Sequence, residues 1–403
     1  MRERKKESLP FFSIVIPTRD RSDLVSSLVW SLLEQNFSNF EILLCDNSNN
    51  NLTQEVLSKF DDDRIVNIRT GNLGMSENYN VGINSASGKY LMCISDKGFL
   101  KQGALSYLHE LIIAENHQCI TWALDNFVYP GHFFPSQSPE KSVSLDSSYI
   151  LKFMLGSDYR SYEPAPMHCT SCISMDLVLA IREKHQNLCQ AQNPDYTMAA
   201  QILLATKTVY NLKDNLAILR NVSSKDGYGM GHSLAMKTKE SQIFLKEHAA
   251  WIEHTNRFLD VPIKDCPFII DLMLKDTYTV LEDNNVSPDI FLSKHERLIA
   301  YYFFAYEEII WRTAHGVDMR PEFNIWLEAL SQENQEVINE INSRKKSLRV
   351  HFVTAKMKYL IKNNALTIYL LEIYRSIRYR YSGKTYKNIE DCYNDNPVHS
   401  SLS

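Results

Sequence analysis

The sequence predicts an α/β protein whose mostly parallel, buried sheet is followed by an α-helical C-terminal region. Apolar β-rich runs alternate with segments of helical spacing in the N-terminal half, as in sheets covered by crossover helices. From residue 241 onward the pattern is helical and rich in aromatic and charged side chains. Because 403 residues exceed the size at which one core keeps growing, we expect one domain at 1–240 and a helical domain at 241–403.

The alternation starts with a strand and continues in order along the chain. A β-rich run at 11–17 (FFSIVIP) precedes helical spacing at 23–35, and an apolar run at 40–45 completes a βαβ unit. Residues 129–158 are rich in Pro, Ser and Gly with little periodicity, so we expect a long loop there. The other expected elements are a helix at 52–60, a strand at 65–69, a helix after the loop 71–80, a strand at 90–94, a helix from Pro194 and a strand at 208–212.

Composition and charge exclude several classes of protein. The net charge of -5 argues against a nucleic-acid-binding protein as a whole. The eight cysteines are scattered, as expected of reduced thiols in the cytoplasm, and the pair Cys169-x-x-Cys172 lacks the second pair that a zinc site needs. No window offers about 18 uncharged apolar residues, so we expect a cytoplasmic protein, soluble or peripheral on the inner face of the membrane.

The C-terminal stretch 344–387 carries twelve basic residues and one acidic residue, Glu372, with tyrosines interleaved among leucines and isoleucines. A basic, aromatic and amphipathic stretch suits an anionic membrane surface. A solvated helix face that is held to the body of the protein by its tyrosines explains the same pattern equally well. Both interpretations stay open at this point.

The stretch GKYLMCISDKGFL joins a buried strand to a polar turn that places the acid Asp96 beside the base Lys97. The carboxyl edge of a parallel sheet is the usual place for ligands in α/β proteins, which makes this charged pair a candidate site. Ser, Asp, Lys and Gly are also ordinary turn residues. The stretch alone therefore does not decide between a site and a solvated turn.

Four motifs occur together in the order and at the spacing typical of one enzyme family. They are SIVIPTRDR at 13–21, NFSNFEILLCDNS at 36–48, GNLGMSENYNVGINSASGKY at 71–90, and SDKG at 95–98. With them the N-terminal part resembles a family-2 glycosyltransferase of the GT-A fold, and the resemblance extends more weakly through NPDYTMAAQILLATK to Gly231–Ser233. It implies that a hexosyl or N-acetylhexosaminyl group passes with inversion from a nucleotide-diphosphate donor, expected to be a UDP-sugar. The acceptor would be a hydroxyl of a glycan or lipid-linked molecule in cell-surface polysaccharide synthesis.

The resemblance and the strand ends together indicate the donor site. Pro17 and Thr18 end the first strand, where a backbone turn can receive the nucleoside, and Arg21 can reach the ribose or a phosphate. Asp46 ends the second strand and corresponds to the family residue that accepts a hydrogen bond from the uracil ring N–H. Its alternative role is an Asx turn. Asn78 matches the family asparagine.

The sequence departs from the family at two positions near the diphosphate. Glu77 stands where the family usually has a basic residue. The family also carries a DxD-type motif that binds a divalent metal, whereas here Asp96 is the single acid and the carboxylate cage for Mg²⁺ or Mn²⁺ is incomplete. In one hypothesis Lys97, with Arg220 or His232, supplies the positive charge and the enzyme needs no metal. In the other, Asp96 and His232 hold a metal loosely. A simpler alternative is that Lys97 is an exposed surface lysine without a role in the site.

Inverting transfer requires a base close to the acceptor hydroxyl, and a carboxylate is the usual choice. We predict Asp195 in this role, because it stands in the first turn of a predicted helix at a position where family members carry an acid. An Asp in a first helical turn is also favoured by the helix dipole alone. The alternatives are Asp158, Glu163 and Asp176, and His168 is expected near the acceptor.

These observations favour a sugar transferase at the cytoplasmic face of the membrane. The incomplete DxD motif and Glu77 also fit a second function, that of a nucleotide-sugar-binding scaffold that partners other glycosyltransferases. A nucleotidyltransferase on a similar frame is disfavoured, because no glycine-rich, basic loop follows the first strand. His232 lies in the glycine-rich run GYGMGHS, which suggests a loop that closes over the donor.

Overall fold

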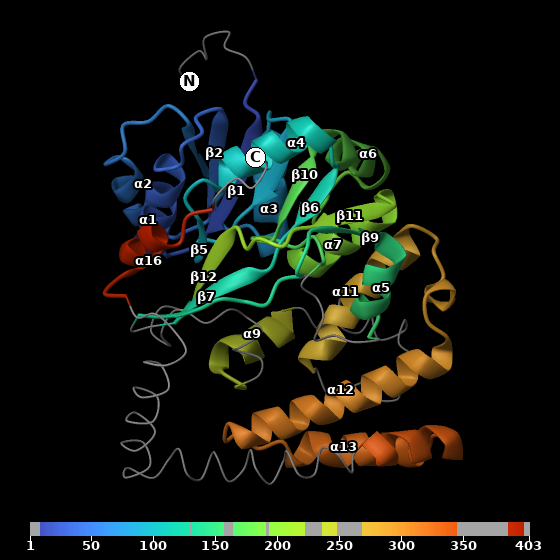
Figure 1. The fold of residues 1–403 in the computed structure, drawn as a ribbon. Coiled ribbons are helices and arrows are strands. Elements are labelled where there is room, and N and C mark those ends of the chain that lie inside the picture. Colours follow the sequence, from blue (N-terminus) through green and yellow to red (C-terminus); the bar gives the residue numbers. More distant parts are fainter. Residues whose placement is uncertain are drawn as a thin grey trace. The chain divides into compact units, whose positions relative to one another are not determined.

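The apolar runs near the N-terminus form the centre of an eight-stranded sheet (Figure 1). Its strand order is β3-β2-β1-β4-β10-β6-β11-β9, in which β1 (Phe12–Thr18) pairs in parallel with β2 (Phe40–Asp46) and with β4 (Tyr90–Cys93). β3 (Ile65–Arg69) extends the parallel part at one edge. The three central strands are mostly apolar and almost wholly buried, which is typical of a parallel sheet with both faces covered.

The rest of this sheet is mixed, and a smaller sheet stands beside it. β10 (Ser171–Ser174) runs antiparallel to β4 and to β6 (Cys119–Thr121). β11 (Thr208–Asn211) and β9 (Val143–Asp146) complete the large sheet. The small sheet has the order β5-β12-β7-β8, with bounds Gly98–Leu100, Ala217–Asn221, Leu124–Val128 and His132–Phe134.

Helices connect these strands, and those at 22–33, 52–57, 75–85 and 194–205 stand where the sequence predicts a helix. The helices are α1 (Ser22–Leu33), α2 (Leu52–Leu57), α3 (Met75–Ser85), α4 (Ala104–Glu115), α5 (Ser147–Met154), α6 (Met175–His185) and α7 (Pro194–Ala205). The α/β class with a largely parallel sheet is thus confirmed. The predicted long loop at 129–158 is wrong, because β8, β9 and α5 lie inside it. Strands of three or four residues at a sheet edge are held by backbone hydrogen bonds and leave little hydrophobic periodicity to detect.

The structure is a computed structural model that describes residues 9–128, 131–156, 164–190, 193–221, 236–247, 268–344 and 386–398. The chain divides into two compact units. The first comprises Met1–Ile150, Tyr162–Asp226 and Lys384–Ser403, and the second comprises Leu151–Ser161 and Gly227–Gly383. A single boundary at residue 240 would assign the last residues to the helical region, whereas their contacts belong to the first unit.

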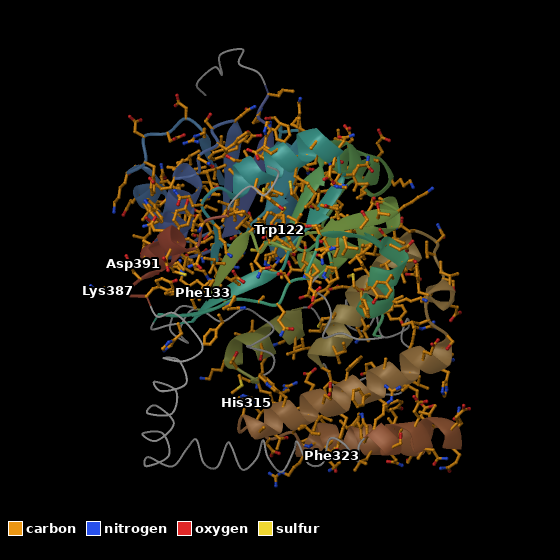
Figure 2. All side chains as sticks on the ribbon, in the orientation of Figure 1. Trp122, Phe133, His315, Phe323, Lys387 and Asp391 are labelled. Carbon is orange, nitrogen blue, oxygen red and sulfur yellow. The ribbon has the colours of Figure 1, made fainter. Side chains whose placement is uncertain are left out.

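The C-terminal segment, residues 386–398, closes the first unit on the side of the small sheet. Tyr393, from α16 (Ile389–Asp395), packs against Trp30 of α1 with ring centroids 5.1 Å apart, and the Tyr386 backbone N donates to Gly131 O at 2.8 Å. Figure 2 shows Phe133 of the small sheet close to this segment. One hydrophobic cluster joins the small sheet to α16. Its members are Phe99, Phe127, Phe133, Ile218, Ile389 and Cys392.

α3 lies unusually close to the sheet because of a glycine. A Cβ added at Gly82 would lie 2.5 Å from Val15 Cγ1 and 2.8 Å from Cys45 Sγ, well inside van der Waals contact. We expect Gly82→Ala to lower the free energy of unfolding by about 1–3 kcal/mol, although alanine favours the helix, because the core must shift to admit the methyl group. Urea unfolding measures this change. Ser85→Ala on the exposed face of the same helix is the control, and an unchanged midpoint for Gly82→Ala would contradict the close packing.

The second unit is helical in the part that the structure describes. It contains α9 (Lys239–Glu247), α11 (Ile269–Asp283), a short 3-10 helix (Pro288–Ile290), α12 (Lys294–Ala314) and α13 (Arg320–Ser331). Ser293 and Glu296 form a capping box at the start of α12, and the buried Trp326 donates from Nε1 to Tyr302 O at 2.9 Å. Among the described residues, none of the helices combines the length and the apolar character that a membrane span requires.

Candidate active site

The strand order brings three predicted residues together at the carboxyl end of the parallel strands. β1 lies between β2 and β4, so its last residue, Thr18, stands beside Asp46 in the strand register and beside Asp96 just after β4. Thr18 Oγ1 donates to Asp96 Oδ2 at 3.0 Å. Asp46 and Asp96 are 0% and 3% exposed. Two buried carboxylates therefore flank Thr18 at the sheet edge where ligands of α/β proteins bind.

Arg21 is the second predicted residue that reaches Asp96. It stands at the start of α1, and its Nη1 lies 3.2 Å from Asp96 Oδ1. Both oxygens of Asp96 are thus engaged, one by the Thr18 hydroxyl and one by the Arg21 guanidinium. These contacts fix the carboxylate and stabilise its negative charge in a buried position.

Asp46 has a partner that the sequence interpretation missed. Arg69 ends β3 in register with Asp46, and its Nη1 lies 2.6 Å from Asp46 Oδ2. Asp46 Oδ1 accepts a hydrogen bond from Ser48 N at 2.9 Å, which is the Asx-type turn considered as its alternative role. The signal for Arg69 was a basic residue at the end of the strand next to Asp46. The pair places a carboxylate and a guanidinium in contact at this strand end.

Asn78 and Glu77 are placed by the first turn of α3. Asn78 is buried, where its Nδ2 donates to Cys45 O at 2.9 Å and its Oδ1 accepts from Thr70 Oγ1 at 2.6 Å. It joins the end of β2 to α3. Glu77 is exposed and accepts from Gly74 N at 2.9 Å, so it caps its own helix, where the helix dipole favours an acid. This capping role explains structurally why an acid stands at position 77, where the family usually has a basic residue.

Lys97 lies half-buried directly after Asp96. Burial lowers the pKa of Lys97, the nearby Arg21 lowers it further, and attraction to Asp96 only partly compensates. Arg220, on β12, donates from its backbone N to Lys97 O at 2.9 Å and carries its guanidinium 5.3 Å from the centroid of Phe99. Two cations, Arg21 and Lys97, therefore surround one carboxylate, which leaves a surplus of positive charge at this strand end.

The described residues do not fit the metal site that the fold family implies. The oxygens of Asp96 already contact Thr18 and Arg21, and Lys97 follows where a second carboxylate would be needed. Within the described ranges there is no group of three or more His, Cys, Asp and Glu residues that could hold a metal ion. His232 lies outside the described residues. A cation beside Arg21 and Lys97 would also be repelled by both of them.

Asp195 contacts a histidine from another part of the chain. It lies in the first turn of α7, and its Oδ1 contacts His168 Nδ1. Both side chains are 26% exposed. Desolvation lowers the pKa of His168, but the charge and the hydrogen bond of Asp195, with a smaller contribution from Asp96, raise it above the usual value of 6.5. Because Asp96 influences His168, the Asp195 pair lies close to the strand end that carries Lys97.

The alternatives to Asp195 are less well placed or lie outside the described residues. Asp176 is exposed in the first turn of α6, and the neighbouring Met175 N donates to Lys89 O at 2.8 Å, before the start of β4. Asp176 is therefore at the opposite end of β4 from Asp96. Asp158 and Glu163 lie outside the described residues.

Buried carboxylates at neighbouring ends of a parallel sheet, with an antiparallel strand returning beside β4, define an α/β domain whose candidate site lies at the carboxyl edge of the sheet. The model of the family described as Glycosyl transferase family 2 matches residues 13–175. The resemblance found in the sequence motifs is confirmed for these residues.

Two proteins are similar to the chain over different lengths. A Campylobacter jejuni protein named GalNAc(5)-diNAcBac-PP-undecaprenol beta-1,3-glucosyltransferase is 33% identical over 104 residues, which are 25% of this chain and 34% of that protein. The chain thus spans about a third of the length of this relative. Crystal structures of S. aureus TarS 1-349, alone and in complex with UDP-GlcNAc, are 14% identical with TM-scores of 0.44 and 0.45, and cover 85% of this chain and 92% of theirs.

Proposed function

We propose that the chain is a glycosyltransferase that moves a hexosyl or N-acetylhexosaminyl group from a UDP-sugar, with inversion, to a hydroxyl of a lipid-linked or glycan acceptor. The observation that carries this proposal is the pair of buried carboxylates, Asp46 and Asp96, on either side of Thr18, with Asp195 close by. The family of residues 13–175 supports sugar transfer. The name of the Campylobacter relative supports a lipid-linked acceptor.

The Asp46–Arg69 pair suits the base of the donor. A uracil ring presents an N–H donor beside a carbonyl acceptor, and a carboxylate and a guanidinium are the complementary acceptor and donor. Asp46 Oδ2 and Arg69 Nη1 bond each other at 2.6 Å, and a bound base would exchange this contact for its own. Arg21 and Lys97 stand at the next strand end, where the diphosphate would follow the ribose. Their two positive charges complement the charge that develops on the leaving diphosphate. We therefore propose transfer without a metal, with Lys97 in the place of the cation.

The role of Asp46 leads to a prediction about nucleotide recognition. Asp46→Asn should weaken UDP binding about tenfold or more, because a hydrogen bond from uracil to a charged acceptor is lost. It should also narrow the preference for UDP over CDP, since the new amide can donate to the ring nitrogen of cytosine. Calorimetry with UDP and CDP measures both effects. Asp62→Asn, which removes one carboxylate of the surface pair Asp62–Arg64, is the matched control. Unchanged UDP affinity would remove Asp46 from the site.

We further propose that the protein acts at the cytoplasmic face of the membrane as a peripheral protein. The support is the positive charge of 344–387, which suits an anionic surface, although 345–385 lies outside the described residues. Incubating the purified chain with radiolabelled UDP-sugars, with and without membranes, tests the function. Transfer of label to lipid or glycan is the expected result. Tight binding without transfer or hydrolysis would favour the scaffold function, and no binding would overturn both.

A further inference from the structure

We propose that His168 and Asp195 act as one hydrogen-bonded pair, in which Asp195 takes the proton of the acceptor hydroxyl and His168 is the positioning residue that holds the Asp195 carboxylate. This inference rests on the proposed function and deepens it. The two residues come from different elements, since His168 precedes β10 and Asp195 begins α7. The contact between Asp195 Oδ1 and His168 Nδ1 is therefore a product of tertiary structure and not of local backbone geometry.

The backbone beside His168 is held by its neighbour Cys169. Cys169 has a φ of +63°, in the left-handed region that non-glycine residues seldom adopt. Its N donates to Cys93 O at 2.7 Å, and its Sγ accepts from Ser95 N at 3.1 Å. Its carbonyl accepts from Trp122 Nε1 at 2.9 Å, and Figure 2 shows Trp122 within the sheet region of the first unit. His168 is thus fixed beside the end of β4, next to Asp96 and Lys97.

The start of α7 is held from the other side, by α3. Asn80 on α3 donates from Nδ2 to Cys189 O at 2.7 Å and accepts from Cys189 N at 3.0 Å. Thr197 Oγ1 accepts from Gln190 N at 3.1 Å and ties the turn before the helix to its first residues. Asp195 therefore rests on a helix end that is fastened to the sheet through α3. The backbone of Asp195 is thus fixed, but its side chain could still change rotamer. The contact with His168 restricts this freedom.

In the part of the chain that the structure describes, few charges face this pair. From the end of β4 come Asp96 and Lys97, and from α3 comes Tyr79, whose ring centroid is 6.2 Å from that of His168. Burial raises the pKa of Tyr79 well above its ordinary value. Burial also raises the pKa of three nearby thiols, those of Cys93, Cys169 and Cys189. These groups therefore stay neutral near pH 7. Among the described residues, the charges that act on the pair from outside are those of Asp96 and Lys97.

The partial exposure of both side chains leaves the pair accessible from solvent, as an acceptor requires. We assign the proton transfer to Asp195 Oδ2, since Oδ1 contacts the imidazole. The acceptor O–H bond breaks, and the proton goes to Oδ2. The acceptor oxygen bonds to the anomeric carbon, and the bond from that carbon to the phosphate oxygen breaks, which releases the nucleoside diphosphate. Protonated His168 would lower the basicity of Asp195, so transfer should weaken as the pH falls through the raised pKa of His168.

Three variants separate positioning from direct base catalysis. His168→Asn retains an N–H donor close to the position of Nδ1 without a ring that titrates, whereas His168→Ala removes the donor. Kinetics with donor and acceptor across the pH range in which histidine titrates should show a kcat about 10- to 100-fold lower for His168→Ala, with the donor KM almost unchanged. His168→Asn should recover most of this loss, and its acid limb should move to lower pH. Asp195→Asn should be the least active.

The controls separate failure of this inference from failure of the proposed function. His117→Ala removes a surface histidine that pairs with Glu115 at 2.7 Å and should leave kcat unchanged, and thermal melting checks that every variant folds. A His168→Asn variant as inactive as Asp195→Asn would overturn the positioning role and make His168 the base. Wild-type activity in His168→Ala would overturn the pairing alone. Absence of transfer by the wild-type protein with every donor would overturn the proposed function instead.

Discussion

Replacing Asp195 by Asn will lower kcat by about 10²- to 10⁴-fold, the range that a positioned general base contributes. The amide cannot accept the proton of the acceptor hydroxyl, but it has almost the same shape as the carboxylate. Binding of UDP should stay as in the wild type, because the nucleotide contacts that we propose are made by Asp46 and Arg69 at other strand ends. Single-turnover kinetics and calorimetry with UDP measure the two quantities separately.

Asp176→Asn is the matched control for this prediction. Asp176 also lies in the first turn of a helix, so the substitution changes the same kind of dipole contact, but at the far end of β4 from Asp96. It should retain full activity. An active Asp195→Asn variant would redirect the search for the base to Asp158 and Glu163, which lie outside the described residues.

Removing the Lys97 ammonium should be the second large effect. Lys97→Ala should lower kcat by about 10²- to 10³-fold, the usual loss when a preorganised electrostatic contact to a developing charge is removed. Lys59→Ala, an exposed lysine after α2, is the control and should be without effect. The wild-type protein should keep its turnover in excess EDTA. Full loss in EDTA that Mn²⁺ restores would contradict the substitution of Lys97 for a metal.

The pH profile gives an independent check on Lys97. The folded protein holds the pKa of Lys97 below the ordinary value of 10.5, first by burial and then by repulsion from Arg21. The ammonium is lost as the pH rises through the lowered pKa. We expect an alkaline limb in kcat at a pH below that of free lysine. This limb should be absent in Lys97→Ala and should move to higher pH in Lys97→Arg, because arginine stays protonated.

The sequence predicted the sheet edge well, because the rules that set it are local and topological. The carboxyl ends of parallel strands in a βαβ repeat lie at the same edge of the sheet. The sequence alone therefore predicts that Thr18, Asp46 and Asp96 lie side by side. Arg69 was missed because a lone basic residue at a strand end has many ordinary explanations. The contact of His168 with Asp195 spans 27 residues and joins the connection before β10 to the first turn of α7, and no periodicity predicts such a pairing.

The return of residues 386–398 to the first unit was also beyond sequence reasoning. Tyr393 OH donates to Ser31 O at 3.2 Å across 362 positions, and such a distance in sequence leaves no pattern to read. The stretch around it looked like part of a helical, basic tail. α16 belongs to the first unit because of its packing against α1 and the small sheet, which local propensity does not reveal.

Because residues 386–398 pack on the first unit, the order in which the chain is synthesised affects the order in which this unit folds. The apolar side chains of Phe99, Phe127 and Phe133 are covered by Ile389 and Cys392, which a ribosome makes last among these residues. A nascent chain therefore carries an uncovered aromatic patch through most of its translation. Contacts of such long range form slowly, and exposed apolar surface invites aggregation during the wait. A premature stop codon far downstream of every residue of the candidate site would leave that patch exposed. The truncated product would then be bound by chaperones or degraded by proteases.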